Sequence, residues 1–194
     1  SFRNFLYDKG ILPAKKVSDV EVICIGNITV GGTGKTPAVQ YFTKKLQKMG
    51  RKVAVVSRGY RGKRKREPLL VSDGREIFAT TRESGDEPFI HALNLKVPVI
   101  VSSNRYKGCL FAKKHFGVDT IVLDDGFQHR KLSRDRDIVL IDATNPFGWG
   151  ELLPKGMLRE DFKKAAKRAS EFIITKSDLV SDREDFKKAA KRAS

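Results

Sequence analysis

The stretch "GNITVGGTGKTP", residues 26–37, follows the apolar run "VEVICI" and constrains the fold more than any other part of the chain. A glycine-rich loop between a strand and a helix can turn main-chain N–H groups toward phosphate oxygens, and the helix N-terminus adds the positive end of its dipole. In such loops a lysine reaches the phosphates and the next hydroxyl holds Mg²⁺, the roles we expect for Lys35 and Thr36. We therefore predict a nucleotide-binding loop made of Gly31, Gly32, Thr33, Gly34, Lys35 and Thr36.

The loop departs from the strict phosphate-loop pattern at one position. Thr29 stands where that pattern has its leading glycine, so we expect the first turn of the loop to be shaped differently. Pro37 fits the first turn of the following helix, where N–H groups have no partner within the helix.

Short, β-branched apolar runs alternate with helical patterns along the rest of the chain. This alternation predicts a three-layer α/β fold of the P-loop NTPase type, with a mostly parallel sheet and helices on both faces. The strands expected are Val20–Ile25, Lys52–Ser57, Val97–Ser102, Asp119–Leu123, Asp137–Asp142 and Glu171–Thr175, and the helices are Lys35–Lys48, Gly85–Leu95, Arg105–Phe116 and Glu160–Ala169.

Length and composition indicate a globular protein domain. The 194 residues, 40% of them hydrophobic, suffice for one sizeable domain with a core. The two cysteines, Cys24 and Cys109, cannot form a disulfide framework, and we expect both to be buried and reduced. No apolar run approaches the length that spans a bilayer, and residues 1–10 do not resemble a signal peptide.

The charge is unusual. A net charge of +16 exceeds the magnitude of about 2–8 that suits a small soluble domain. Such an excess favours an anionic partner, namely nucleic acid, an anionic lipid surface or a phosphorylated substrate, over a merely soluble surface.

A basic insert follows the second expected strand. Residues 58–66, "RGYRGKRKR", lead into "EPLLVSDGREIFATT", where Asp73-Gly74 between two apolar runs indicates a β-hairpin. The loop and hairpin are expected to project beside the second strand. They could form a lid over anionic groups, a solvated surface loop or, more weakly, a nuclear-localisation segment.

The segment "TIVLDDGFQH", residues 120–129, resembles a Walker B strand. A carboxylate at its end would face the phosphate loop and bind Mg²⁺, directly or through water, although Asp124 and Asp125 before Gly126 would also suit an ordinary turn. Which aspartate binds the metal stays open. His129 could assist the metal or phosphate, or be structural.

Two further motifs are ambiguous by themselves. "ESGDEPF" puts Asp86 and Glu87 in the first turn of a helix, where acidic residues ordinarily complement the dipole. "NRYKG" offers Arg105 and Lys107, which could grip a phosphate or simply be exposed.

Taken together, these stretches resemble the tetraacyldisaccharide 4'-kinase family, the lipid A 4'-kinases of Gram-negative bacteria. The motifs "GNITVGGTGKTP", "SRGY", "GDEP", "NRYKG", "DDGFQHRKLSRD" and "ELLPKGMLRE" occur here in that family's order. The resemblance implies that ATP, with Mg²⁺, phosphorylates the 4'-hydroxyl of a tetraacylated glucosamine disaccharide 1-phosphate. It also implies that the family's loop lacks the leading glycine.

The resemblance also implies roles for individual residues. Asp86 would be the base acting on the acceptor hydroxyl, with Lys35 and Asp125 as its catalytic companions. Thr36, Glu87, Asp124 and Asp125 would organise the metal, whereas Tyr60, Arg105, His129 and Glu160 would support the active site or contact substrate. The expected setting is the cytoplasmic face of the bacterial inner membrane, with the protein bound peripherally as a monomer and no nucleic acid as partner.

The chain departs from the family at its ends. The resemblance implies an N-terminal membrane helix and a C-terminal domain whose histidine partners the catalytic aspartate, and we expect neither to be part of these 194 residues; "LRED" stands where the family usually has "LREP". We therefore expect residues 1–180 to be an ATP-binding kinase domain, truncated at both ends relative to the family, that binds nucleotide but phosphorylates lipid poorly or not at all. The sequence "REDFKKAAKRAS" occurs at 159–170 and again at 183–194, so residues 181–194 are interpreted as a duplicated basic helical tail, natural or artefactual, without functional weight.

Other interpretations remain open from the residues. A regulatory or metallochaperone P-loop NTPase is suggested by "ITKSD", residues 174–178, which resembles a guanine-reading loop except for its threonine. A basic nucleic-acid-binding module would use the charge but not "DDGFQH", and a catalytically inactive scaffold is the third alternative.

Overall fold

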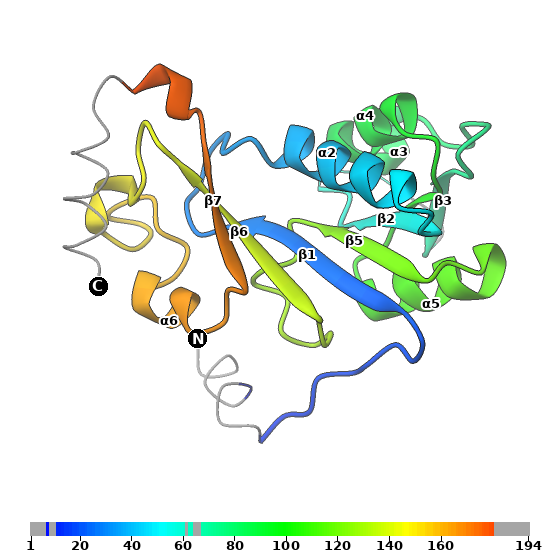
Figure 1. Ribbon diagram of the computed structural model, residues 1–194, viewed down its shortest axis with the longest axis horizontal. Helices are drawn as coiled ribbons and strands as arrows, with labels where there is room; N and C mark the ends of the chain where they lie inside the picture. The colour runs from blue at the N-terminus through cyan, green and yellow to red at the C-terminus, as the bar shows by residue number, and fades with distance from the viewer. Residues whose placement is uncertain (1–6, 8–10, 61, 64–66, 181–194) are drawn as a thin grey trace.

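The computed structural model describes residues 7, 11–60, 62–63 and 67–180. Within them, the strands form one sheet in the order β3-β4-β2-β5-β1-β6-β7 (Figure 1). Neighbouring strands are parallel except for the β3–β4 pair, which is antiparallel at one edge. The strands are β1 Glu21–Asn27, β2 Val53–Ser57, β3 Leu69–Ser72, β4 Val99–Val101, β5 Thr120–Asp124, β6 Arg136–Asp142 and β7 Glu171–Thr175.

Helices cover both faces of the sheet and make the predicted three layers (Figure 1). α2 (Lys35–Lys48) and α4 (Asp86–Asn94), with the short α3 (Thr81–Ser84), lie on one face, where Val39 and Ala92 join a core with Val55. α5 (Arg105–Phe116) and α6 (Phe162–Ala166) lie on the other face, where Cys109 and Ala165 join a second core. The α/β architecture is therefore confirmed.

The central strands are buried on both faces, which explains their continuous apolar sequences. Every residue of β2, β4 and β5 is buried, whereas the edge strand β7 alternates between half-buried and exposed side chains. Both cysteines are wholly buried and free, as predicted. None of the helices in the described ranges is long and apolar enough to cross a bilayer.

The predicted hairpin forms only in part. Its turn is present, since the Asp73 N–H donates to Glu76 (3.3 Å) and the Phe78 N–H donates to Val71 (2.8 Å). Its first limb, however, is β3, which joins the main sheet beside β4, and its second limb makes a single bridge from Ile77 to Ser72. The limb therefore extends the sheet instead of projecting freely beside the second strand.

The C-terminal helix is shorter than predicted. α6 covers Phe162–Ala166 because Asp161 caps it, its carboxylate accepting a hydrogen bond from the Lys164 N–H (3.0 Å). Two 3-10 turns, η1 (Gly148–Gly150) and η2 (Ser177–Leu179), complete the described elements. The repeat at residues 183–194 lies outside the described residues.

The strand order fixes where the site forms. In a parallel sheet the carboxyl ends of the strands meet at one edge, and ligands bind in the crevice there. β1 leads into the phosphate loop and pairs with β5, Ile25 lying opposite Asp124. β2 and β4 end nearby with Ser57 and Val101 in register. The predicted loop and the predicted carboxylates are therefore neighbours in space.

Candidate active site

The phosphate loop runs from the end of β1 at Asn27 to the start of α2 at Lys35. Gly31 (φ 121°) and Gly34 (φ 79°) adopt backbone angles that favour glycine, and the Thr33 N–H donates to Gly31 (3.1 Å). A side chain at Gly32 would meet no neighbour within 4 Å, so the backbone there is open to an approaching ligand. The loop therefore has positive-φ glycines and an accessible backbone, as expected of a phosphate-binding loop.

Thr29, which stands where the strict pattern has its leading glycine, is not among the residues with a positive φ, so its position does not require glycine. It is 4% exposed and forms an antiparallel bridge with Leu158. The flanking residues repeat this pairing, since the Val30 N–H donates to Met157 (2.8 Å) and the Arg159 N–H donates to Ile28 (2.7 Å). The first half of the loop is therefore held by the segment before α6.

Two further contacts hold the loop. The hydroxyl of Thr175, the last residue of β7, donates to the carbonyl of Thr33 (3.0 Å). The buried Asn27 donates through Nδ2 to the carbonyl of Thr29 (2.6 Å) and accepts at Oδ1 from Lys35 Nζ (3.4 Å). The side chain of Lys35 therefore extends from the end of the loop back toward Asn27 at its beginning.

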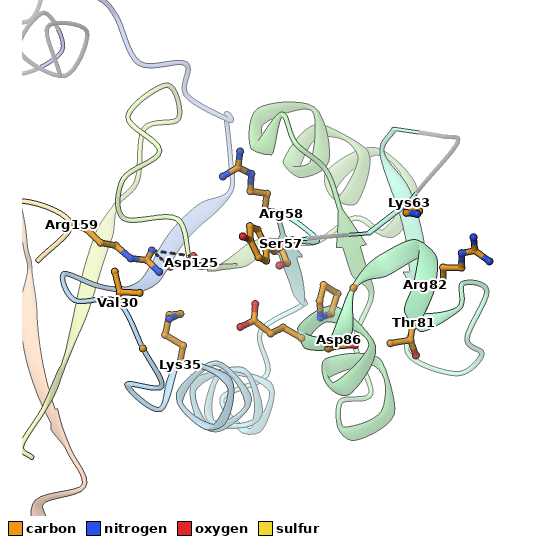
Figure 2. A pocket seen from close by; sticks show the side chains of 15 residues that line it. Val30, Lys35, Ser57, Arg58, Lys63, Thr81, Arg82, Asp86, Asp125 and Arg159 are labelled. Atoms are coloured by element: carbon orange, nitrogen blue, oxygen red, sulfur yellow. Dashed lines mark hydrogen bonds and ion pairs between the residues drawn. The ribbon is translucent and has the colours of Figure 1, made fainter. Parts of the chain in front are cut away.

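A cleft of about 730 Å³ opens in front of the loop. Lys35 points from the start of α2 toward the ion pair between Arg159 and Asp125, and Asp86 lies across from it at the start of α4 (Figure 2). Besides these four, the lining residues are Val30, Gly31, Ser57, Arg58, Tyr60, Lys63, Thr81, Arg82, Gly85, Glu87 and Pro88. The structure thus brings residues of the predicted loop and of the "GDEP" motif into one cavity with Asp125, while Asp124 lies buried beside it.

The two aspartates at the end of β5 have different surroundings. Asp124 is 1% exposed, and its Oδ2 lies 3.3 Å from both Ser57 Oγ and His91 Nε2. Asp125 follows with a left-handed backbone (φ 53°) and pairs with Arg159 Nη1 at 3.1 Å. A buried, oriented carboxylate therefore lies next to one that faces the cavity.

Asp86 and Glu87 stand at the start of α4, directly after Gly85. Gly85 has φ 87°, and a Cβ there would lie 2.7 Å from the carbonyl of Tyr60, so this position requires glycine. Burial raises the pKa of Glu87, and the nearby Asp124 carboxylate adds to that shift while Lys35 opposes it. Glu87 is therefore close enough to both Asp124 and Lys35 to be affected by their charges.

Three predicted supporting residues lie outside the cleft lining. Arg105 is buried at the start of α5, where it donates to the Ser103 carbonyl (3.2 Å), and burial lowers its pKa. Glu160 pairs with Arg168 and accepts from Gln128 Nε2 (3.3 Å). The His129 N–H donates to Gly126 (2.9 Å). These contacts brace the loops behind the site, whereas Tyr60, the fourth such residue, lines the cleft.

Several residues of the site were missed at the sequence level, namely Asn27, Ser57, His91 and Arg159. Ser57 and Arg159 lie within the quoted motifs "SRGY" and "ELLPKGMLRE", which were the available signal for them. His91 carried no signal, because its contact with Asp124 joins residues that lie far apart in the chain.

The basic insert contributes cations to one wall of the cleft. Arg58 and Lys63 of the insert line the cleft, as do Arg82 of α3, Lys35 and Arg159 (Figure 2). The Lys63 N–H donates to the Arg82 carbonyl (2.8 Å), which ties the insert to α3. Within the described residues, no three His, Cys, Asp or Glu side chains gather as a ready-made metal cage.

A mostly parallel sheet with a glycine loop between β1 and α2, and with aspartates at the end of the adjacent β5, defines the chain as a P-loop protein of the nucleotide-binding class. The model of one family, described as "Tetraacyldisaccharide-1-P 4'-kinase", matches residues 1–193. The chain therefore belongs to the tetraacyldisaccharide-1-P 4'-kinase family.

Individual relatives agree with this family. The chain is 47% identical to a tetraacyldisaccharide 4'-kinase of Halothermothrix orenii over 92% of its own length and 46% of the relative's. It is 46% identical to one from an Anaeromyxobacter strain, over 91% and 47% of the two lengths. The chain spans about half the length of the curated relatives that it matches.

A solved structure is also similar. It is the "apo" form of LpxK from Aquifex aeolicus in complex with ATP, with 42% identity and a TM-score of 0.83. The match covers 94% of this chain and 56% of the other chain.

Proposed function

We propose that this chain binds Mg·ATP in the cleft and supplies the nucleotide site of a kinase. That kinase would transfer the γ-phosphate to the 4'-hydroxyl of a tetraacylated glucosamine disaccharide 1-phosphate. The observation that carries the proposal is the meeting of Lys35, Asp86 and Asp125 around one cavity at the carboxyl edge of the sheet. Family membership and the similarity to an ATP complex support the same activity.

The donor set suits Mg²⁺. This ion takes oxygen ligands and is usually held by one or two carboxylates together with substrate phosphates, so it needs no cage made of protein alone. Asp124, Asp125 and the Thr36 hydroxyl would hold it, with Glu87 nearby. The ion would neutralise charge on the β- and γ-phosphates.

The side chains divide the remaining work. Loop N–H groups and Lys35 would hold the triphosphate. Asp86 would accept the proton of the 4'-hydroxyl as that oxygen bonds to the γ-phosphorus. The bond from that phosphorus to the β–γ bridging oxygen breaks, and ADP leaves. Arg159 would lie beside the charge that develops on the transferred group.

A location at an anionic membrane surface belongs to the same proposal. The net charge of +16 supports it, because each Lys or Arg near such a surface contributes about 1 kcal/mol of attraction. Sedimentation with anionic vesicles, but not with zwitterionic ones, and its loss at high salt would check this part. Equal sedimentation with both vesicle types would contradict it.

The decisive experiment has two arms. Calorimetric titration of the chain with Mg·ATP should show binding that Lys35→Met abolishes and Lys48→Met, at the far end of the same helix, leaves intact. Labelled ATP with the lipid disaccharide acceptor should give labelled lipid in a full-length relative, and Asp86→Asn there should stop transfer while ATP binding persists. Absence of Mg·ATP binding by the wild-type chain would overturn the nucleotide site. Undiminished transfer by Asp86→Asn would overturn the assignment of the base.

A further inference from the structure

His91 lies on α4 and is completely buried. Its Nε2 lies 3.3 Å from Asp124 Oδ2. Its other ring nitrogen, Nδ1, has no hydrogen-bond partner among the residues that the structure describes. Among the described residues, the imidazole of His91 thus has one hydrogen-bond contact, which is with Asp124 Oδ2.

The direction of the hydrogen bond follows from the chemistry of the two groups. An ionised carboxylate only accepts hydrogen bonds, so Nε2 must carry the hydrogen and donate it. The Ser57 hydroxyl donates to the same Oδ2, also at 3.3 Å. Two donors from two different elements, α4 and the end of β2, thus fix the rotation of the Asp124 carboxylate at the end of β5.

An apolar side chain would fill the space of His91 without leaving a buried nitrogen unpartnered. A buried polar group without a partner is costly, which makes an imidazole a poor choice for packing alone. A histidine at this position is explained if the hydrogen bond from Nε2–H to Asp124 contributes to the function of the site.

The contact also links the two halves of the site. His91 follows Glu87 by four residues on α4, so both side chains lie on the same face of that helix. The helix that presents Asp86 to the acceptor side of the cleft is thereby attached to the strand that presents Asp124 to the metal side.

We propose that His91 is a positioning residue, which through its Nε2–H holds the Asp124 carboxylate in the orientation that receives Mg²⁺. The inference rests on the proposed function, because it concerns the Mg²⁺ that accompanies ATP. Residues that orient metal-binding groups in this way typically contribute about 10- to 100-fold to metal affinity.

The test compares ATP affinity with Mg²⁺ and with EDTA in folded variants of the chain. His91→Leu and His91→Asn should lower the Mg²⁺-dependent gain in ATP affinity by about 10- to 100-fold. His91→Gln, whose longer amide places an N–H near the position of Nε2, should restore most of the gain. His115→Leu removes an exposed histidine at the far end of α5 and should leave the gain at its wild-type value.

Two results would overturn the inference. One is a wild-type Mg²⁺ gain in folded His91→Leu. The other is an equal loss in the Leu, Asn and Gln variants, which would indicate a packing role alone. A wild-type chain that shows no Mg·ATP binding would instead overturn the proposed function itself.

A second readout needs neither metal nor nucleotide. Nitrogen-15 spectra of the metal-free protein, assigned by loss of the signal in His91→Gln, should show His91 protonated at Nε2 and bare at Nδ1. A proton on Nδ1 with Nε2 bare would contradict the proposed hydrogen bond.

Discussion

Arg159 and Asp125 form an ion pair at 3.1 Å across the opening of the phosphate loop. Arg159 comes from the segment that pairs with the loop, whereas Asp125 directly follows the neighbouring strand β5. The pair therefore joins the segment that braces the loop to the end of β5 in the lining of the cleft.

We expect Arg159→Ala to weaken ATP binding more than it weakens the fold. Both side chains are partly exposed, and exposed pairs contribute only about 0–1 kcal/mol to stability. A hydrogen bond to a charged group contributes about 1.5–3 kcal/mol, so the loss of Arg159 from a phosphate should reduce affinity by at least about tenfold. Calorimetry with Mg·ATP and urea unfolding measure the two effects. A large loss of stability with unchanged affinity would contradict this expectation.

Gly34→Ala and Gly50→Ala form a matched pair. Both glycines have left-handed backbones, φ 79° and φ 80°, and each substitution should cost about 1–2 kcal/mol of stability from backbone strain. Neither new Cβ would clash, since the nearest atom to it is Thr175 Cγ2 at 3.5 Å for Gly34 and nothing lies within 4 Å for Gly50. Only Gly34 belongs to the phosphate loop, so only Gly34→Ala should weaken ATP binding. Equal affinities of Gly34→Ala and Gly50→Ala for ATP would contradict the prediction that the loop at Gly34 binds the phosphates.

The pH dependence of stability should carry a signature of Asp137. Burial raises the pKa of this carboxyl, even though Arg134 pairs with it at 2.9 Å. The folded protein therefore holds this proton to higher pH than the unfolded chain. The contribution of Asp137 to stability is greatest below its ordinary pKa and is lost as pH rises through the folded value.

Urea unfolding of wild type and Asp137→Asn between about pH 3 and pH 7 measures this contribution. The free-energy difference, wild type minus variant, should fall as pH rises. Asp73→Asn is the control of opposite sign, because hydrogen bonds from the Glu76 and Arg75 N–H groups lower the pKa of Asp73. A difference for Asp137 that rises with pH would contradict the prediction.

Both thiols should be unreactive until the protein unfolds. Burial raises the pKa of Cys109 to about 12 and also raises that of Cys24, and both side chains are wholly buried. A colorimetric thiol reagent at about pH 8 attacks thiolates, so reaction should be slow in the native protein and rapid in denaturant. Rapid labelling of either cysteine in the native state would show that its core opens locally.

Local patterns in the sequence were enough to predict the central part of the fold. The glycine loop that leads into α2 and the strand β5 are continuous segments whose chemistry depends on neighbouring residues; β5, predicted at Asp119–Leu123, lies one residue further along at Thr120–Asp124. The bounds of α2 and α5 were correct, because glycines or an Asn cap fix their ends.

The remaining features depend on contacts between distant segments. His91 and Ser57 meet at Asp124 only because β5 pairs with β2 in the sheet, which no local pattern reveals. The role of Thr29 likewise appears only once Leu158 is placed beside it. The hairpin was predicted from its turn alone, and the choice of β4 as the neighbour of β3 was not encoded in that turn.

The hydrogen bond from Thr175 to Thr33 joins residues 142 positions apart. A ribosome releases the glycine loop long before it makes β7, so the backbone of the loop stays without this brace while the residues between Thr33 and Thr175 are synthesised. The order of synthesis thus delays the finished shape of the loop until β7 has joined the sheet, so a nascent chain that stops short of residue 175 should hold nucleotide less firmly than one that includes β7.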